Sequence, residues 1–325
     1  MTLPTPGLPT TGLPTLGLVG LGKIARDQHI PAIAATGLFE LAAVVSPDGD
    51  SAGTGGVPCF RSQAEMLAAL PGLDAMAICT PPAVRHGLTV EALRAGKHVL
   101  IEKPPAATLS EMQDIAAQAQ AARRTLLTAW HSRFNPAVEE ARQRLADATV
   151  RSVAITWKED VRRWHPGQDW IFAAGGFGVF DPGINALSIL TAVLPAPVFV
   201  RSAELHVPAN RDTPIRAMLE MRAAPGAPVG VVTADFDFLQ QGEQTWSIAI
   251  ETADGSRLDL THGGTRLIVD GVPAMAEPDS EYQRIYRHFH RLMLDGASDI
   301  DARPLHLVAD ACLVGRWRTT DAFHW

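Results

Sequence analysis

The sequence predicts an α/β domain followed by an α+β domain. The first has a doubly wound parallel sheet, and the second is α+β with a large, open, mostly antiparallel sheet. In the first half, short apolar runs alternate with helical patterns of about 10–15 residues, which is typical of βαβ units. A glycine-rich turn follows the first apolar run. After about residue 150, strand-like runs are joined by turns such as Asp254-Gly255 and Asp270-Gly271, which suit hairpins.

The first half gives one continuous series of strands and helices. Thr108 or Ser110 is the expected N-cap of the last helix in this series. Because every strand is followed by a helix, the crossovers should be right-handed. The expected strands are Leu16–Gly20, Phe39–Val45, Ala75–Cys79, His98–Ile101 and Thr125–Ala129, and the expected helices are Lys23–Ala35, Gln63–Leu70, Val84–Ala95 and Thr108–Arg123.

The second half predicts a sheet with few helices between its strands. An open sheet face must be covered, and a second copy of the chain is the usual cover, so we expect a homo-oligomer, either a dimer or a tetramer. The expected strands are Val150–Trp157, Val198–Val207, Arg216–Arg222, Val229–Phe238, Trp246–Glu251, Arg257–Leu260 and Leu267–Val269, followed by helices Glu281–Leu294 and Pro304–Thr319.

We therefore expect three segments along the chain. Residues 1–15, rich in Pro, Thr and Gly, are predicted to be a disordered lead, and they lack the basic start and apolar run of a secretory signal. Residues 16–135 form the dinucleotide-binding domain. Residues 136–325 form the substrate-binding and oligomerisation domain, whose last helix, about 304–319, is a candidate to pack back on the first domain.

Composition excludes several classes of protein. The 325 residues carry a formal net charge of −7, are 46% hydrophobic and are 19% charged. This balance argues against disorder and against nucleic-acid binding, which needs a basic surface. No apolar stretch reaches the roughly 18 residues that a membrane span needs. The three cysteines give neither a disulfide framework nor a zinc spacing, so a cytoplasmic protein without a metal is expected.

A dinucleotide fingerprint follows the first strand. Gly20-Leu-Gly22-Lys-Ile-Ala25 matches G-x-G-x-x-A between a strand and a helix. Gly20 permits a tight turn, Gly22 lets the backbone approach a pyrophosphate, and the helix N-terminus supplies donors for the phosphates. The alternative is a glycine turn in another doubly wound fold.

The residue at the end of the second strand determines whether NAD or NADP is preferred. An acidic residue there binds the ribose 2′-hydroxyl, whereas an arginine accommodates a 2′-phosphate. Ser46 tolerates either group, no arginine follows it, and Asp48 would repel a phosphate. This pattern favours NAD over NADP, leaves the use of both open, and leaves Asp48 equally well explained as a solvated turn residue.

Two more loops follow parallel strands, at the edge where such sheets bind ligands. Thr80-Pro81-Pro82 should pack against the nicotinamide ribose, and Glu102-Lys103-Pro104-Pro105 holds a lysine that can donate to a substrate hydroxyl or act as a base. The expected cofactor contacts are Gly20, Gly22, Lys23, Ile24, Ser46, Thr80, Pro81, Pro82, His86, Glu102 and Lys103.

The fingerprint, the Thr-Pro-Pro loop, Glu102-Lys103-Pro104 and the open antiparallel sheet together resemble the Gfo/Idh/MocA oxidoreductases. Three longer motifs resemble the subgroup of bacterial L-arabinose and D-galactose 1-dehydrogenases. The resemblance implies oxidation of an aldopyranose at C1 to the lactone, with hydride transfer to NAD(P). The three motifs are Gly22-Lys-Ile-Ala-Arg-Asp-Gln-His29, Trp157-Lys-Glu-Asp-Val-Arg-Arg-Trp-His165 and Phe180-Asp-Pro-Gly-Ile-Asn185.

Oxidation of a hemiacetal hydroxyl needs a base near that hydroxyl. Asp181 and Asn185 are four residues apart and share a face if a helix begins at Pro182. Many family members carry histidine where this chain has Asn185, and asparagine cannot relay a proton. We therefore expect Asp181 to be the acid/base, Lys103 to be the alternative, and Asn185 to orient sugar hydroxyls.

A sugar site also needs hydrogen-bonding side chains and an apolar platform. Trp164 could stack on a pyranose face and Glu159 could accept from two hydroxyls. Each of these side chains has packing as its alternative role, and the neighbouring Lys158 and Asp160 are better explained as ordinary surface or interface charge. The expected substrate contacts are Lys103, His131, Glu159, Trp164, His165, Asp181, Asn185 and Trp246.

Three functions fit these features. The first is an aldose 1-dehydrogenase acting on a free pentose or hexose. The second is another sugar or polyol reaction of the family, such as inositol oxidation or keto-sugar reduction. The third is a catalytically silent NAD(P)-binding regulator, which would need neither Lys103 nor Asp181.

Overall fold

The computed structural model describes residues 12–278 and 280–325, and these residues divide into two compact units. The first unit comprises the described residues up to Trp130 together with Glu281–Asp301, and the second comprises the described residues of His131–Ser280 together with Ala302–Trp325. Of the lead expected over residues 1–15, the first 11 residues lie outside the described residues.

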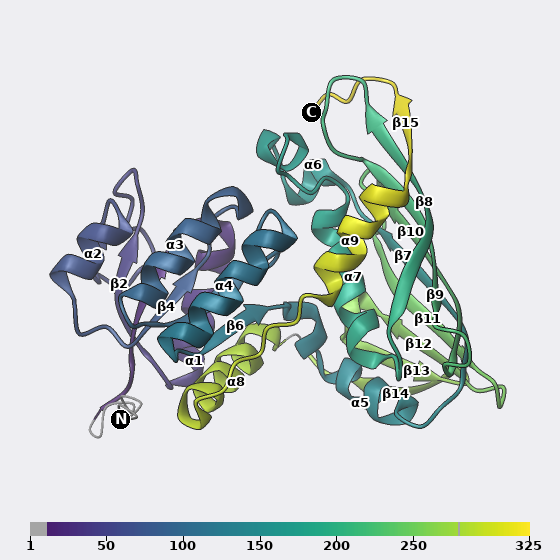
Figure 1. Cartoon of the computed structure of the whole chain (residues 1–325), viewed down its shortest axis with the longest axis horizontal. Helices are drawn as coiled ribbons and strands as arrows, with labels where there is room; N and C mark the ends of the chain where they lie inside the picture. The colour runs from purple at the N-terminus through teal and green to yellow at the C-terminus, as the bar shows by residue number, and fades with distance from the viewer. Residues whose placement is uncertain (1–11, 279) are drawn as a thin grey trace. The chain divides into compact units, whose positions relative to one another are not determined.

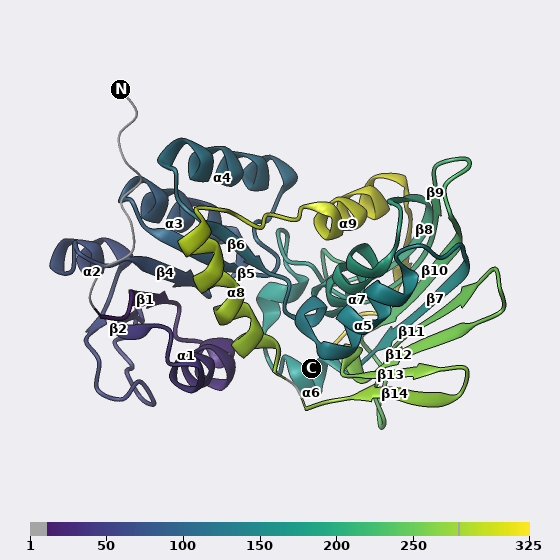
Figure 2. The same cartoon turned by 90° about the horizontal axis from the view of Figure 1, so that it is seen from below.

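The first unit is built on a six-stranded sheet in the order β3-β2-β1-β4-β5-β6, in which every pairing is parallel. This confirms the predicted doubly wound sheet. In Figure 2, α2, α3 and α4 lie on one face of this sheet, and α1 and α8 lie on the other. Its strands are β1 Thr15–Val19, β2 Glu40–Val45, β3 Cys59–Phe60, β4 Ala75–Ile78, β5 His98–Glu102 and β6 Leu126–Ala129, and its helices are η1 Ala25–His29, α1 Ile30–Thr36, α2 Gln63–Ala69, α3 Pro82–Arg94, α4 Leu109–Ala122 and α8 Glu281–Asp295.

The helix after the glycine turn is not uniform. Lys23 and Ile24 are already α-helical, a π-helical turn, η1, follows, and the helix continues as α1, whereas the sequence predicts one regular helix over Lys23–Ala35. Single π turns are often found at functional sites. At the next crossover the local pattern holds, because Thr108 and Glu111 form a reciprocal capping box at the start of α4.

Helix α8 completes the first unit, although it was expected in the second domain. Its apolar face is aromatic, and Tyr282, Tyr286 and Phe289 are buried. The ring of Phe39 lies 5.7 Å from that of Phe289 and 5.8 Å from that of Tyr286. Without α8, this aromatic surface beside α1 would face water. The cost of that exposure explains why the division differs from the expected boundary after residue 135.

The second unit contains a nine-stranded sheet in the order β14-β13-β12-β11-β7-β10-β9-β8-β15. Only β7 with β10 and β8 with β15 pair in parallel, so the predicted, mostly antiparallel sheet is confirmed. At the predicted turn before β14, Asp270 and Gly271 both have positive φ, as a tight hairpin requires. The strands are β7 Val150–Lys158, β8 Val198–Pro208, β9 Arg216–Ala223, β10 Val229–Asp237, β11 Thr245–Thr252, β12 Arg257–Thr261, β13 Arg266–Val269, β14 Val272–Ala276 and β15 Arg316–Thr320.

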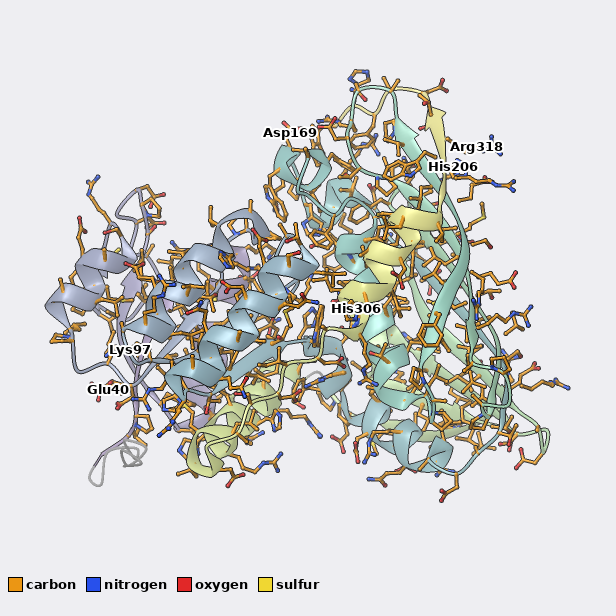
Figure 3. The ribbon with its side chains drawn as sticks, viewed as in Figure 1. Glu40, Lys97, Asp169, His206, His306 and Arg318 are labelled. Atoms are coloured by element: carbon orange, nitrogen blue, oxygen red, sulfur yellow. The ribbon has the colours of Figure 1, made fainter. Side chains whose placement is uncertain are left out.

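One face of this sheet is covered by helices α5, α7 and α9 (Figure 1). Strand β9 shows the result, because Ala217, Leu219 and Met221 are buried while Met218 on the opposite face is 46% exposed. On the outer strands, His206 of β8 and Arg318 of β15 are register partners (Figure 3). The helical segments of the unit are η2 His131–Phe134, α5 Pro136–Leu145, α6 Val161–Trp164, η3 Asp169–Phe172, α7 Phe180–Val193, η4 His262–Gly264 and α9 Arg303–Val314.

The last expected helix, Pro304–Thr319, is wrong in its end. Helix α9 stops at Val314, and Arg316–Thr320 instead forms β15. Gly315 adopts an extended conformation, and a Cβ there would lie 2.4 Å from the Ala311 carbonyl oxygen, so the helix ends at this glycine. Within the second unit, helix α9 packs against α7 and β8.

Candidate functional site

The glycine turn of the first unit closes against the end of β4. Gly20 has φ +93°, and a Cβ there would lie 2.9 Å from Thr80 Cγ2. In contrast, a Cβ on Gly22 would meet no heavy atom within 4 Å. The first intrahelical bond runs from Arg26 N to Gly22 O at 3.2 Å, so the amides of the preceding residues lie at the open N-terminus of the helix. This arrangement fits an approaching pyrophosphate.

The Thr80 loop carries a second feature that fits a cofactor. Thr80 Oγ1 is buried and has no hydrogen-bond partner among the residues that the structure describes. A buried hydroxyl without a partner costs free energy, which a bound ligand would recover. Pro81 caps α3 and Pro82 is its first residue. These residues would hold a nicotinamide dinucleotide, whose ring accepts or gives a hydride.

Another expected cofactor residue, His86, is turned toward protein. Its Nε2 lies 2.7 Å from Asp114 Oδ2 on α4. This hydrogen bond lowers the pKa of Asp114. The pair links α3 to α4, so its clearest role in the structure is to join two helices.

The loop after β2 lies beside an arginine that the sequence analysis did not connect with it. Ser46 Oγ donates to Asp48 Oδ1 at 2.5 Å, and this bond lowers the pKa of Asp48. Arg26 reaches the same loop from η1, donating through Nη2 to Asp50 Oδ2 at 2.6 Å and through Nη1 to the Ala52 carbonyl. Its Nε donates at 3.2 Å to the Leu21 carbonyl, inside the glycine turn. No arginine follows Ser46 in sequence, so a local search along the chain could not find it.

Lys103 follows β5, in a loop whose Lys103–Pro104 peptide is cis. The preceding Glu102 is 2% exposed and was expected to contact the cofactor. Its Oε1 instead lies 3.0 Å from His29 Nε2 and accepts from the Tyr282 hydroxyl at 2.7 Å, and its Oε2 accepts from the Lys103 amide at 2.9 Å. The Glu102 carboxylate thus faces protein donors.

In the second unit, three of the expected sugar-binding residues form one cluster. Trp246 Nε1 donates to Glu159 Oε2 at 2.8 Å, and the rings of Trp164 and Trp246 meet edge to face at 5.5 Å. Glu159 is 6% exposed. Trp164 Nε1 is buried, and the described part of the chain offers it no acceptor. The cluster therefore has an indole N–H that suits a ligand oxygen.

The neighbouring residue, His165, meets the proposed acid/base. His165 Nε2 lies 3.5 Å from Asp181 Oδ2, and Asp181 is 5% exposed. This chain has Asn185 where many family members carry a histidine beside the aspartate. Here His165, from a different segment, lies beside Asp181. Helix α7 begins at Phe180, before the expected Pro182, because Phe180 N already bonds Phe177 O at 3.0 Å. Asn185 lies one turn beyond Asp181 on this helix.

The segment that carries Trp164 and His165 is fastened by the last residues of the chain. Arg162 Nη2 donates to the His324 carbonyl at 2.7 Å. Asp169 Oδ1, labelled in Figure 3, accepts from Trp325 Nε1 at 2.8 Å. The Phe323 ring lies 5.2 Å from that of Phe172 in η3. We call Phe323–Trp325 the C-terminal strap.

The remaining expected residues have simpler surroundings. His131 lies in η2, with its Nδ1 3.3 Å from Ser132 Oγ. Lys158 pairs with Asp235, and Asp160 caps α6 by accepting from the Arg162 amide at 3.0 Å. The last two contacts agree with the expectation of ordinary surface charge for Lys158 and Asp160.

No group of three or more His, Cys, Asp or Glu side chains among residues 12–278 and 280–325 is arranged to hold a metal ion. In the same ranges, no helix has the length and apolar character needed to cross a membrane.

Comparison with known proteins gives concordant results. Residues 15–129 match the family model GFO_IDH_MocA, described as an oxidoreductase family with an NAD-binding Rossmann fold. A galactose 1-dehydrogenase from Pseudomonas fluorescens is 47% identical over 307 residues, which cover 93% of this chain and 96% of the relative.

Solved structures agree with this relationship. The crystal structure of a D-galactose 1-dehydrogenase from Rhizobium etli matches with a TM-score of 0.91 at 47% identity, covering 98% of this chain and 100% of the other. KijD10, a 3-ketoreductase from Actinomadura kijaniata solved with NADP and TDP-benzene, gives a TM-score of 0.80 at 19% identity, covering 95% of this chain and 100% of that one, and shares the fold alone.

Proposed function

Because the chain belongs to the Gfo/Idh/MocA family of NAD-binding oxidoreductases, we propose that it oxidises an aldopyranose at C1 to the aldonolactone. D-galactose and L-arabinose are the proposed substrates. The observation that carries the proposal is the 47% identity, over nearly the whole chain, to a galactose 1-dehydrogenase. The two sugars present the same ring hydroxyls, and L-arabinose lacks only the C6 hydroxymethyl group.

The tryptophan–glutamate cluster supports a sugar as the ligand. Trp164 offers both a ring face and a buried N–H that has no acceptor among the described residues. Glu159 accepts from Trp246 Nε1 at 2.8 Å, and a carboxylate is a residue type that also accepts from ring hydroxyls. Stacking on an apolar face and bidentate acceptance by a carboxylate are what a polyhydroxylated ring needs from a protein.

The proposed chemistry assigns the proton to Asp181. A bound nicotinamide dinucleotide would supply the acceptor for the hydride that leaves C1. As the hydride leaves, the Asp181 carboxylate accepts the proton of the C1 hydroxyl, and the C1–O bond becomes the lactone carbonyl. His165, 3.5 Å away and with a side chain 22% exposed, orients the carboxylate and passes the proton to solvent. Asn185 orients hydroxyls, and Lys103 is the alternative proton acceptor.

The loop after β2 supports NAD as the preferred cofactor, with NADP also accepted. Asp48, fixed by the Ser46 hydroxyl, would accept a hydrogen bond from a ribose 2′-hydroxyl. Arg26 is paired with Asp50 at 2.6 Å and would exchange that carboxylate for a 2′-phosphate. The test is the ratio of kcat/KM for the two cofactors, which Asp48→Ser should shift toward NADP.

The proposed assembly is a dimer or tetramer formed through the open face of the nine-stranded sheet. That face carries large apolar side chains, including Met218, which is 46% exposed. Light scattering coupled to size-exclusion chromatography would give the number of copies. The described cysteines are unpaired, which agrees with action in the reducing cytoplasm.

A sugar panel tests the proposed function directly. The purified protein is incubated with NAD or NADP and with D-galactose, L-arabinose, D-glucose, D-xylose and myo-inositol, and reduced cofactor is followed by absorbance. We expect the first two sugars to give the highest kcat/KM, and we expect NMR to identify the lactone. Turnover of inositol alone would favour a polyol dehydrogenase, and no turnover with any sugar would refute the proposal.

A further inference from the structure

The backbone on both sides of Lys103 is held by buried side chains. Arg85, 5% exposed, donates through Nη1 to the Glu102 carbonyl at 2.9 Å and to the Pro104 carbonyl. The Lys103 amide donates to Glu102 Oε2 at 2.9 Å. The carbonyls before and after Lys103 and its own N–H are therefore all bound by side chains, which leaves its backbone little freedom to rotate.

The Glu102 carboxylate is itself fixed from the other side. Its Oε1 lies 3.0 Å from His29 Nε2 and accepts from the Tyr282 hydroxyl at 2.7 Å. His29 Nδ1 lies 2.8 Å from the hydroxyl of Tyr286. His29 is 0% exposed and Tyr282 is 3% exposed, so the whole network lies in the core of the first unit.

The charge state of this network follows from its neighbours. Burial alone would lower the pKa of His29, but Cys79, Tyr286 and Glu102 raise it well above its ordinary value. The Tyr286 hydroxyl stays protonated, because burial raises its pKa to about 12. A histidine whose pKa is raised therefore lies beside a buried carboxyl group, and the two tyrosine hydroxyls complete the hydrogen bonds of this pair.

Stability alone is a weak reason for such a network. Burying a charged pair costs desolvation free energy, and apolar residues of similar volume often stabilise a core as well or better. His29 of η1 and Tyr282 of α8 both contact the Glu102 carboxylate. That carboxylate in turn accepts from the amide of Lys103. The network therefore converges on one peptide group, that of Lys103.

We propose that His29 and Tyr282 are positioning residues that act through the Glu102 carboxylate to hold the Lys103 backbone and so direct the side chain that carries the Lys103 ammonium. The proposal rests on the proposed function in one respect, because it assigns the Lys103 ammonium to the dehydrogenase site. It adds residues from η1 and α8 to the set that governs catalysis, although neither contacts a reacting atom.

The kinetic test is Tyr282→Phe, which removes one donor to Glu102 and keeps the ring. We expect kcat for the sugar to fall about 10-fold, while the Kd for NADPH, measured by fluorescence, stays within twofold. The matched control is Phe39→Leu, which disturbs the packing of the same helix without contacting Glu102. It should lower the Tm and leave kcat unchanged. His29→Leu should resemble Tyr282→Phe, and His29→Gln, which retains a donor, should recover most of kcat.

A second measurement does not require turnover. The chain has four lysines, Lys23, Lys97, Lys103 and Lys158, so reductive ¹³C-methylation gives few lysine signals. The Lys103 signal is identified by its loss in Lys103→Arg. We expect Tyr282→Phe to shift this signal by more than its linewidth and to leave the other three in place.

The two measurements separate the positioning role from the proposed function. An unchanged Lys103 signal, or an unchanged kcat in folded Tyr282→Phe, would overturn the positioning role. A shifted Lys103 signal in a protein that oxidises no sugar would support the positioning role and refute the sugar dehydrogenase.

Discussion

The C-terminal strap offers a test of how the proposed sugar site is held together. Phe323 is 5% exposed and lies on three partners, with its ring 5.2 Å from Phe172, 5.3 Å from Trp325 and 4.6 Å from the Arg162 guanidinium. Asn210 binds its backbone at both the amide and the carbonyl, each at 2.9 Å. Phe323→Ala removes the ring contacts and keeps the two backbone hydrogen bonds.

The size of the effect follows from these contacts. Truncating a buried phenylalanine to alanine costs about 3–5 kcal/mol. The strap can open without global unfolding, so much of this cost should appear as local release. A loss of about 3 kcal/mol lowers the ratio of docked to released strap more than 100-fold, since about 1.4 kcal/mol is tenfold. The two backbone hydrogen bonds contribute only about 1 kcal/mol each. The released strap then leaves the Trp164–His165 segment without its fastening.

We expect Phe323→Ala to raise the KM for D-galactose about 10-fold, with the Kd for NADPH unchanged. Removal of Trp325 by carboxypeptidase A, a cleavage at the C-terminal end of the strap, reports its release independently of activity. Leu313→Ala, at a side chain that is 81% exposed, is the control and should change neither quantity. If cleavage shows release while KM stays within twofold, the strap does not organise the substrate segment and the reasoning is wrong.

Four further outcomes are expected. Asp181→Asn should lower kcat by about 10²–10⁴, as expected for loss of an acid/base, and near-normal kcat would remove Asp181 from that role. Gly20→Ala should weaken NADPH binding at least 10-fold in fluorescence titration, because φ +93° disfavours alanine by about 1–3 kcal/mol and the added Cβ would lie 3.0 Å from Thr80 N. Arg26→Ala should lower kcat/KM for NADP about 10-fold relative to NAD, and an unchanged ratio would exclude Arg26 from phosphate binding. Burial and Arg124 lower the pKa of His98 to about 4, so the unfolded chain binds a proton that the folded chain does not between about pH 6.5 and 4. As the pH is lowered through that window, the free energy of unfolding measured by urea titration should therefore fall by up to about 3 kcal/mol. His98→Asn should reduce this dependence on pH.

The sequence predicts the first unit well because its signals are local. The glycine fingerprint, the buried run of β4 and the capping box at Thr108 each depend on residues close together in the chain, and the structure has all three. Helix α5, Pro136–Leu145, was not predicted. The end of α9 was missed because the break depends on Gly315, whose added Cβ would meet Ala311 O and the Leu205 side chain, and Leu205 lies on a distant strand.

The candidate site shows the same limit. Residue types identified Asp181, Trp164 and Glu159 as candidates, but they did not predict which side chains contact one another. Arg26 reaches the loop that follows β2, and His165 reaches Asp181, only after folding brings those segments together. A single sequence does not contain these distances, because a long side chain can face any of several neighbours until the packing is known.

The first unit is discontinuous, and this affects the order in which the chain can fold. On a ribosome, the six strands emerge by residue 129, but α8 ends at Asp295 and emerges only after all of β7–β14. Until then, His29 and Glu102 lack Tyr282 and Tyr286, and Phe39 lacks the ring of Phe289. While most of the second unit is being synthesised, the first unit therefore lacks α8. During that time His29, Glu102 and the ring of Phe39 are without the side chains that cover them in the folded protein. A fragment ending at residue 130 should accordingly aggregate, whereas the same fragment supplied with a separate peptide spanning 281–301 should recover solubility.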